Sequence, residues 1–252
     1  DETLFDFDTS EYNAFRETTL SYGYPFTDEL YDEYHLVNKS LWEEFELGKV
    51  TKAFLTVERF RRVIDAHGIA ADPEEFSRCY KEALANQCIL LPGAEEFCRT
   101  LAPEAELYIL TNGITMIQTR RFERSSIREL IKGLFISEQV GTPKPNKEFF
   151  DAVFASVPDF DKSKAVMIGD SLSSDIRGGI NAGITTLSVT ISAFVPTTPR
   201  RAMNRYCASC TVKRAECRRM YRYKQSITPI NRAETKGVSP DYDHQRTAHR
   251  FL

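Results

Sequence analysis

Polar residues that could bind a phosphate or a hard cation occur at four points of the chain, most of them directly after a short apolar run. They are Asp1, Thr111 with Asn112, Lys144, and Asp170 with Asp175. In open α/β sheets the ligand site lies beyond the carboxyl ends of the strands. We therefore expect these side chains to converge at one edge of a sheet.

Each of these segments alone has a structural explanation, because turn residues follow strands and carboxylates cap helices. Together they meet the needs of phosphate-ester hydrolysis. Carboxylates around Mg²⁺ and a nearby lysine neutralise the phosphoryl oxygens. Thr111 and the neighbouring backbone amides can donate to a phosphate oxygen. An aspartate can attack phosphorus, which divides one difficult displacement into two steps through an acyl phosphate.

The segment that carries most of these residues has the pattern of a parallel α/β sheet. After Leu91-Pro92-Gly93, short apolar runs alternate with amphipathic helical patterns. The runs are Leu107–Leu110, Leu134–Ile136, Ala165–Ile168 and Thr185–Val189. The sequence therefore predicts an α/β fold with a Rossmann-like parallel sheet core.

Residues 8 to about 87 show a helical pattern instead, because apolar residues recur three and four positions apart. Thr51 and Asp72 are expected helix starts, and Gly48 and Gly68 are expected helix ends. This segment predicts a small all-helical unit inserted ahead of most of the sheet.

Composition limits the class of protein. A chain of 252 residues with 42% hydrophobic content can bury a sizeable core. No segment approaches the ~18 uninterrupted apolar residues of a membrane span, and the start does not read as a signal peptide. We expect a cytoplasmic protein with no membrane partner. The six cysteines are irregularly spaced, which favours reduced thiols over a disulfide framework.

Charge divides the chain into two unlike parts. Residues 1–189 hold 20 of the 33 Lys and Arg residues and 32 of the 36 Asp and Glu residues, which gives a net charge of −12. Residues 190–252 hold the other 13 and 4, which gives +9. Apolar periodicity is also lost beyond Thr190. We expect residues 191–252 to form a basic tail that is disordered or improperly packed.

In order and approximate separation, the four polar segments resemble the motifs of the haloacid dehalogenase (HAD) superfamily. The family's first motif runs Asp-x-Asp-x-Thr, and Asp1-Glu2-Thr3 is similar to its second half. The resemblance implies that Asp1 is catalytic: it protonates the leaving oxygen, activates water and offers its backbone carbonyl to Mg²⁺.

The same resemblance implies roles for the other residues. Thr111 and Lys144 match the second and third motifs and would be catalytic and bind phosphate, with Asn112 beside them. Asp170 and Asp175 match the fourth motif. Asp170 would be a direct ligand of Mg²⁺, and Asp175 a ligand through water or a support.

The resemblance also implies a division into domains. Residues 1–5 and 88–190 would form the HAD-like core, and residues 6–87 the helical cap that excludes water and selects substrates. The nucleophilic aspartate would sit two positions before Asp1, outside the given sequence, after a central strand. We therefore expect the chain as given to be inactive or nearly so, with two strands left with unpaired buried edges.

The basic tail does not resemble the family's acidic closing helix. A shifted reading frame and a natural extension are both open explanations.

Asp1 favours a phosphatase over a dehalogenase, because a phosphate ester's leaving group needs an acid. Four segments resemble the pyrimidine 5′-nucleotidases that remove noncanonical nucleoside monophosphates: Asp1–Asp8, Val37–Trp42, Ile136–Lys147 and Gly178–Gly183. The resemblance implies a pyrimidine nucleoside monophosphate as substrate, with a general sugar-phosphate or small-metabolite phosphatase as the alternative. A monomer and a homodimer are both compatible.

Other readings remain open. The basic tail, in which Arg and Tyr are interleaved, could bind nucleic acid, although we do not expect nucleic acid as a partner. Cys207, Cys210 and Cys217 could be part of a zinc site, but a second ligand couple at a set spacing is missing. A non-catalytic scaffold is the third reading. In the cap, Tyr31, Tyr34, Trp42 and Phe45 could stack on a base, although core packing is the commoner role, and His35 and His67 read as surface or capping residues.

Overall fold

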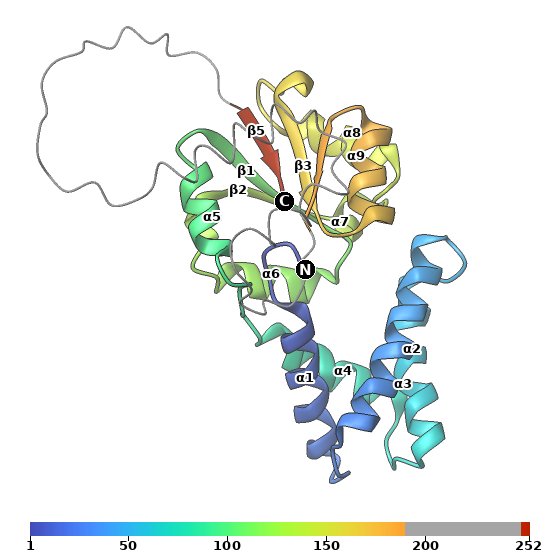
Figure 1. Cartoon of the computed structure of the whole chain (residues 1–252). Coiled ribbons are helices and arrows are strands. Elements are labelled where there is room, and N and C mark those ends of the chain that lie inside the picture. The colour runs from blue at the N-terminus through green and yellow to red at the C-terminus, as the bar shows by residue number, and fades with distance from the viewer. Residues whose placement is uncertain (190–247) are drawn as a thin grey trace, which may run out of the picture.

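The computed structural model describes residues 1–189 and 248–252, which form a helical cap and an α/β core (Figure 1). The α/β class with a parallel sheet is as the sequence predicts. The expectations for the basic tail and for a zinc site at Cys207, Cys210 and Cys217 lie outside the described residues, apart from the last five. In the described part of the chain, no helix is both long enough and apolar enough to cross a bilayer.

The cap consists of α1 (Phe7–Ser21), α2 (Asp28–Glu46), α3 (Lys52–His67) and α4 (Pro73–Ala85). A side-chain oxygen caps the start of each helix by accepting a backbone N–H bond, at Asp6, Thr27, Thr51 and Asp72. Helix α3 ends at Gly68, whose φ of 60° is a left-handed conformation. The helix starts at Thr51 and Asp72 and the end at Gly68 are thus confirmed.

An aromatic cluster holds the cap helices together. Phe15, Tyr34, Phe60 and Tyr80 are fully buried, and the rings of Phe15 and Tyr34 stack with centroids 4.1 Å apart. Ile117 of the core packs into the same cluster. The cap is therefore not an independent body, because its hydrophobic core extends onto the α/β part.

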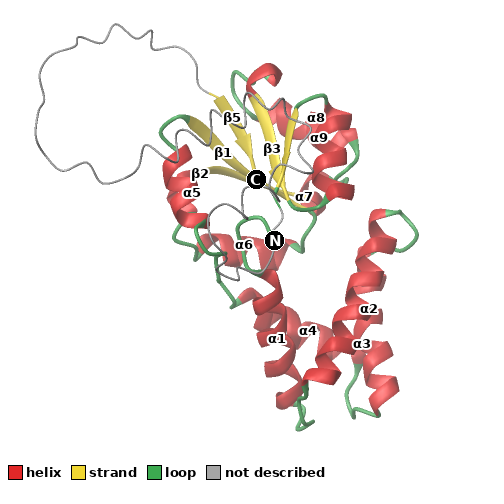
Figure 2. Cartoon of the chain, viewed as in Figure 1, coloured by secondary structure: helices red, strands yellow, loops and turns green. Residues whose placement is uncertain are grey.

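In the part of the chain that the structure describes, the sheet has five parallel strands in the order β2-β1-β5-β3-β4. They are β1 (Ala105–Thr111), β2 (Ile131–Ile136), β3 (Ala165–Gly169), β4 (Thr185–Ser188) and β5 (Ala248–Phe251). The first three contain the apolar runs predicted from the sequence, and β4 contains the fourth run except for Val189. Figure 2 shows the strands between two groups of helices. These are α5 (Ala94–Leu101) and α6 (Thr115–Glu123) on one side, and α7 (Ser137–Val140), α8 (Lys147–Ser156) and α9 (Arg177–Ala182) on the other.

Alternate residues of β1 pack against the two helical layers, as the two-residue period of a strand requires. Leu107 and Ile109 join a cluster with Cys98 of α5, whereas Tyr108 and Leu110 join one with Phe149 of α8 and its neighbours. Both faces of the sheet are therefore buried, which places the open ligand site at its edge.

The C-terminal strand β5 corrects the prediction that two strands keep unpaired buried edges. It lies between β1 and β3 and pairs with both, with Phe251 opposite Tyr108 on one side and Met167 on the other. Leu252 continues the ladder by exchanging backbone hydrogen bonds with Tyr108 and Leu110. The expectation that residues 191–252 form a disordered or improperly packed tail is wrong for residues 248–252. The physical reason is that buried N–H and C=O groups on β1 and β3 demand partners.

Two chain segments side by side connect cap and core. An antiparallel bridge joins Phe5 to Leu90, and Asp6 N donates to Ile89 O at 3.0 Å while Leu91 N donates to Leu4 O at 2.8 Å. The chain leaves the core and returns to it at one place, so Asp1 to Phe5 lie beside the start of α1 and near the carboxyl edge of the sheet.

Candidate active site

A buried ion pair lies at the carboxyl edge of the sheet. Lys144 Nζ donates to Asp175 Oδ1 at 2.5 Å and to the carbonyl oxygen of Leu110 at 2.7 Å. The side chains of Lys144 and Asp175 are only 8% and 6% exposed. A charge buried this deeply is expensive unless it is paired, so each of the two holds the other in place.

The loop that carries Lys144 is clamped by Asn112. The Asn112 side chain donates to the backbone oxygen of Lys144 and accepts from its backbone N–H, both at 2.9 Å. The structure thus places Asn112 as a support of the lysine loop rather than as a side chain free to reach a ligand. Thr111, at the end of β1, is buried, and its Oγ1 accepts from the N–H of Gly113 at 3.0 Å. A hydroxyl that accepts one bond can still donate its own proton.

Two further acidic groups follow β3. Asp170 Oδ1 accepts from Thr3 Oγ1 at 2.7 Å, which ties the end of β3 to the first residues of the chain. Asp175 lies in a single helical turn, Leu172–Ile176, where its Oδ2 accepts from the N–H of Ser171 at 3.2 Å. Gly169 is required here, since a Cβ at that position would overlap the Asp175 carboxylate.

Asp1 completes the group. Thr3, two positions further on, donates to Asp170, so the first residues of the chain lie beside the end of β3 and its ion pair. The structure therefore brings Asp1, Lys144, Asp170 and Asp175 into one small region. The carboxylate of Asp1 is bound by Arg121 and Gln118 of α6, two residues that the sequence analysis did not single out.

The donor set fits a hard cation in type. Asp170 accepts one hydrogen bond through Oδ1, whereas Asp175 is bonded through both oxygens, to Lys144 and Ser171. Mg²⁺ is usually held by one or two carboxylates and several waters. Asp170 therefore fits a direct ligand and Asp175 a support. Within residues 1–189 and 248–252, three or more His, Cys, Asp or Glu side chains do not gather around a common point.

The end of α2 and the start of α3 reach this edge from the cap. Lys52 Nζ donates to the carbonyl oxygens of Asn112 and Gly113 at 2.6 and 3.1 Å, and lies 3.4 Å from a carboxylate oxygen of Glu138. Burial lowers the pKa of Lys52. Ser173 donates to Glu46, the last residue of α2. The cap thus contacts the loops that follow β1, β2 and β3.

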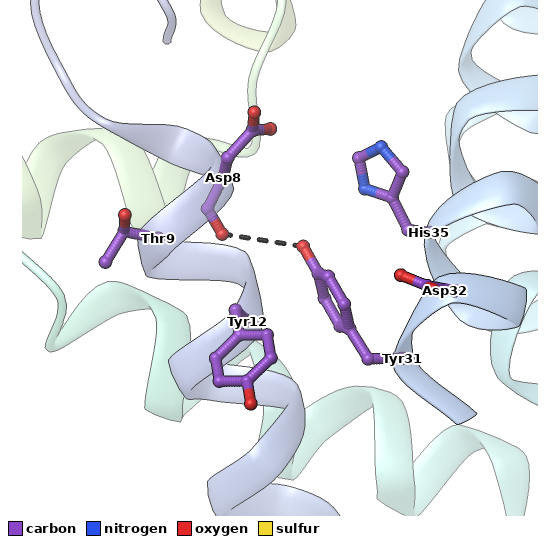
Figure 3. A pocket seen from close by; sticks show the side chains of 6 residues that line it. All are labelled: Asp8, Thr9, Tyr12, Tyr31, Asp32 and His35. Atoms are coloured by element: carbon purple, nitrogen blue, oxygen red, sulfur yellow. Dashed lines mark hydrogen bonds between the residues drawn. The ribbon is translucent and has the colours of Figure 1, made fainter. Parts of the chain in front are cut away.

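An open surface cavity of about 450 Å³ lies between α1 and α2 of the cap (Figure 3). Its lining comes from the start of α1 and from one face of α2: Asp8, Thr9, Tyr12, Tyr31, Asp32 and His35. Behind it, the fully buried Glu11 lies 2.7 Å from His35 Nδ1 and accepts from Asn38 Nδ2 at 2.5 Å. The hydrogen bond to Glu11 raises the pKa of His35.

The structure distinguishes the roles of two cap tyrosines that the sequence could not assign. Tyr34 is fully buried in the cap cluster and cannot reach a ligand, whereas Tyr31 lines the cavity. His35 is partly exposed and paired with Glu11, and His67 pairs with Glu33 at 2.8 Å. The prediction that the two histidines are surface residues therefore agrees with their positions.

Comparison with protein families shows the family to which the chain belongs. The family model of the haloacid dehalogenase-like hydrolases matches the sequence over residues 1–189. The chain belongs to this family, and it is an enzyme with the HAD-like fold.

The chain is also similar in sequence to individual members of the family. The chain is 37% identical over 186 residues to pyrimidine 5′-nucleotidase YjjG of Escherichia coli, covering 74% of this chain and 81% of that protein. It is 38% identical over 188 residues to pyrimidine 5′-nucleotidase PynA of Streptococcus pneumoniae, covering 74% and 79%. The magnesium-bound structure of the HAD-hydrolase YfnB from Bacillus subtilis matches with a TM-score of 0.73 and 33% identity, over 79% of this chain and 87% of that one.

Proposed function

We propose that this enzyme hydrolyses phosphate monoesters in the presence of Mg²⁺, with pyrimidine nucleoside 5′-monophosphates as its best substrates. The observation that carries the proposal is the buried Lys144–Asp175 pair beside Asp170 at the sheet edge. It provides a cation for the phosphoryl group and a carboxylate for a metal in one place. Two relatives named as pyrimidine 5′-nucleotidases support the substrate class.

The proposed mechanism assigns one task to each group. Lys144 and Thr111 bind the phosphoryl oxygens, and Asn112 holds the lysine loop. Asp170 would hold Mg²⁺ with the backbone carbonyl of Asp1, and Asp175 would support both Lys144 and the metal. When bound, Mg²⁺ would neutralise negative charge on the phosphoryl group.

The covalent step uses a carboxylate two positions before Asp1, outside the given sequence. That carboxylate forms a bond to phosphorus while the bond from phosphorus to the ester oxygen breaks, and Asp1 gives its proton to the departing oxygen. Asp1 then takes a proton from the water that attacks the acyl phosphate, which releases inorganic phosphate and restores both carboxyl groups.

The cap cavity would take the nucleoside. Tyr12 and Tyr31 offer aromatic edges, and Thr9 and His35 offer hydrogen bonds, which together suit a pyrimidine ring with polar substituents. We also propose residues 1–5 and 88–190 as the catalytic core and residues 6–87 as the cap. A cytoplasmic location and a monomeric or homodimeric state remain predictions.

The test compares residues 1–252 with an extended chain, in which residues preceding Asp1 place an aspartate two positions before it. Both forms are assayed with uridine monophosphate, glucose 6-phosphate and p-nitrophenyl phosphate, with Mg²⁺ and with EDTA. We expect Mg²⁺-dependent turnover in the extended chain and the highest kcat/KM for uridine monophosphate. A higher kcat/KM for glucose 6-phosphate would replace the nucleotidase by a general sugar phosphatase. Equal turnover by both forms would refute the assignment of the nucleophile.

A further inference from the structure

The carboxylate of Asp1 is held at two points by side chains of one helix. Arg121 Nη1 donates to Asp1 Oδ1 at 2.5 Å, and Gln118 Nε2 donates to Oδ2 at 2.8 Å. Residues three positions apart lie on one face of a helix, so α6 presents both donors together. Since each oxygen has its own donor, both the position and the rotation of the carboxylate are fixed.

Arg121 is itself fixed by both connections between cap and core. Its side chain is 1% exposed, its Nε donates to the carbonyl oxygen of Gln87 at 2.9 Å, and its Nη2 lies 3.5 Å from Ser10 Oγ. The guanidinium also lies over the ring of Phe5, 4.9 Å from the centroid. Gln87 and Ser10 flank the two chain crossings, so Arg121 places Asp1 relative to the cap as well as to the sheet.

Gln118 reaches Asp1 because Gly113 leaves room for it. A Cβ added at Gly113 would overlap the side-chain amide of Gln118. Gly113 follows Thr111, the last residue of β1, and Asn112. The approach of Gln118 to Asp1 is therefore built into the loop after β1.

We propose that Arg121 and Gln118 are positioning residues for Asp1, which hold its carboxyl group where it can give a proton to the leaving oxygen. This inference rests on the proposed function. Neither residue needs to touch the substrate, because both act through Asp1. When the proton has moved to the ester oxygen, the guanidinium stabilises the carboxylate that remains. Without its two donors the Asp1 side chain can rotate among its staggered positions and lose alignment.

The test exploits a difference between leaving groups. A nucleoside 5′-alkoxide needs a proton to depart, whereas p-nitrophenolate leaves without one. The parameter kcat/KM covers the reaction only as far as release of the leaving group, so it isolates the acid step. In the extended chain, Arg121→Gln and Gln118→Leu should lower kcat/KM for uridine monophosphate by about tenfold or more, a part of the ~10²–10⁴ that general acids contribute. For p-nitrophenyl phosphate the fall should stay below about threefold.

Arg120 provides the matched control. It neighbours Arg121 on α6, but its side chain is 40% exposed and pairs with Glu82 at 2.7 Å. Arg120→Gln should leave both substrates unchanged, and Arg121→Lys should recover part of the activity of Arg121→Gln on uridine monophosphate. Equal losses on both esters would show a purely structural role and overturn the proposal, as would no loss on either.

A second measurement does not depend on turnover. In residues 1–252, Asp1→Asn and Arg121→Gln are combined in a thermal-unfolding cycle. We expect the double variant to lose less Tm than the sum of the single losses, because the two residues contact each other. Strictly additive losses would overturn the contact. An extended chain that hydrolyses neither ester would refute the proposed function itself, and the thermal cycle would still decide whether Arg121 binds Asp1.

Discussion

The position of β5 in the middle of the sheet predicts that Phe251 is among the most important residues for the stability of this chain. Phe251 is fully buried, and its ring centroid lies 5.8 Å from those of Tyr108 and Phe154 and 5.9 Å from that of Phe160. Truncation of a core phenylalanine to alanine costs about 3–5 kcal/mol. For a chain of this size each kcal/mol lowers Tm by about 2–4 °C, so Phe251→Ala should lower Tm by roughly 6–20 °C.

The assay is thermal unfolding of residues 1–252, followed by circular dichroism. Leu36→Ala is the control, because Leu36 is 66% exposed on α2 and its truncation should change the free energy of unfolding by no more than about 0.5 kcal/mol. Deletion of residues 248–252 should destabilise the chain further than Phe251→Ala. If both changes left Tm at the wild-type value, β5 would not occupy the centre of the sheet and the reasoning would fail.

The extended chain sharpens this test. The family resemblance puts its own first strand, directly before Asp1, in the place that β5 fills here. The two segments then compete for the edges of β1 and β3. Residues 190–247 separate β4 from β5 in the sequence, whereas the preceding segment adjoins Asp1 directly. Bringing together residues that are farther apart in the chain costs more entropy, about 0.6 kcal/mol for each doubling of the separation. We expect the preceding segment to win, so that Phe251→Ala changes the Tm of the extended chain by only about 2 °C.

Three further predictions concern the site and the cap. Asp170→Ala should abolish Mg²⁺-dependent turnover of the extended chain in a phosphate-release assay, because the metal loses its charged ligand. Lys144→Met should destabilise residues 1–252 by about 3–5 kcal/mol in urea unfolding, because Asp175 keeps a buried charge without its partner. The pKa of His35 is raised in the folded state by its hydrogen bond to Glu11, so the stability that this pair adds is full below the ordinary value of 6.5 and lost as pH rises through the folded pKa. His35→Gln should therefore lower Tm more at pH 5.5 than at pH 9, as measured by scanning calorimetry.

Controls for these predictions come from the same chain. Turnover by Asp170→Ala that resists EDTA would refute the metal assignment. Adding Asp175→Asn to Lys144→Met should recover part of the lost stability, because the unpaired charge is removed; a further loss would contradict the argument. An equal Tm loss for His35→Gln at both pH values would show that the His35–Glu11 contact does not depend on protonation.

The elements and the carboxyl-edge residues could be predicted because their signals are local. The apolar runs of β1 to β4 and the caps at Thr51 and Asp72 are written in a few neighbouring residues. Parallel topology then brings the strand ends together, which is why Lys144 and Asp175 could be expected in one place.

Arg121 could not be found in this way. It stands beside Arg120, a residue of the same type on the same helix, yet one side chain is 1% exposed and the other 40%. Which of them faces inward depends on how α6 packs between the sheet and the cap. The contact between Arg121 and Asp1 is set by this tertiary packing and not by the local sequence.

The position of β5 in the sheet could not be predicted from the sequence either. The strand's sequence, which includes His249 and Arg250, has no long apolar run that would mark a central strand. Its position is determined by β1 and β3, because their facing backbone N–H and C=O groups are buried and need hydrogen-bond partners. Backbone hydrogen bonds do not depend on side-chain identity, so many sequences could form this strand. The site residues Thr111 and Asp170, by contrast, lie at the ends of β1 and β3 and not on β5. β5 can therefore fill the central place while the neighbouring strands keep Thr111 and Asp170, the proposed phosphate and metal ligands, at their ends. In the extended chain, the segment before Asp1 would bring the carboxylate on which the proposed covalent step depends.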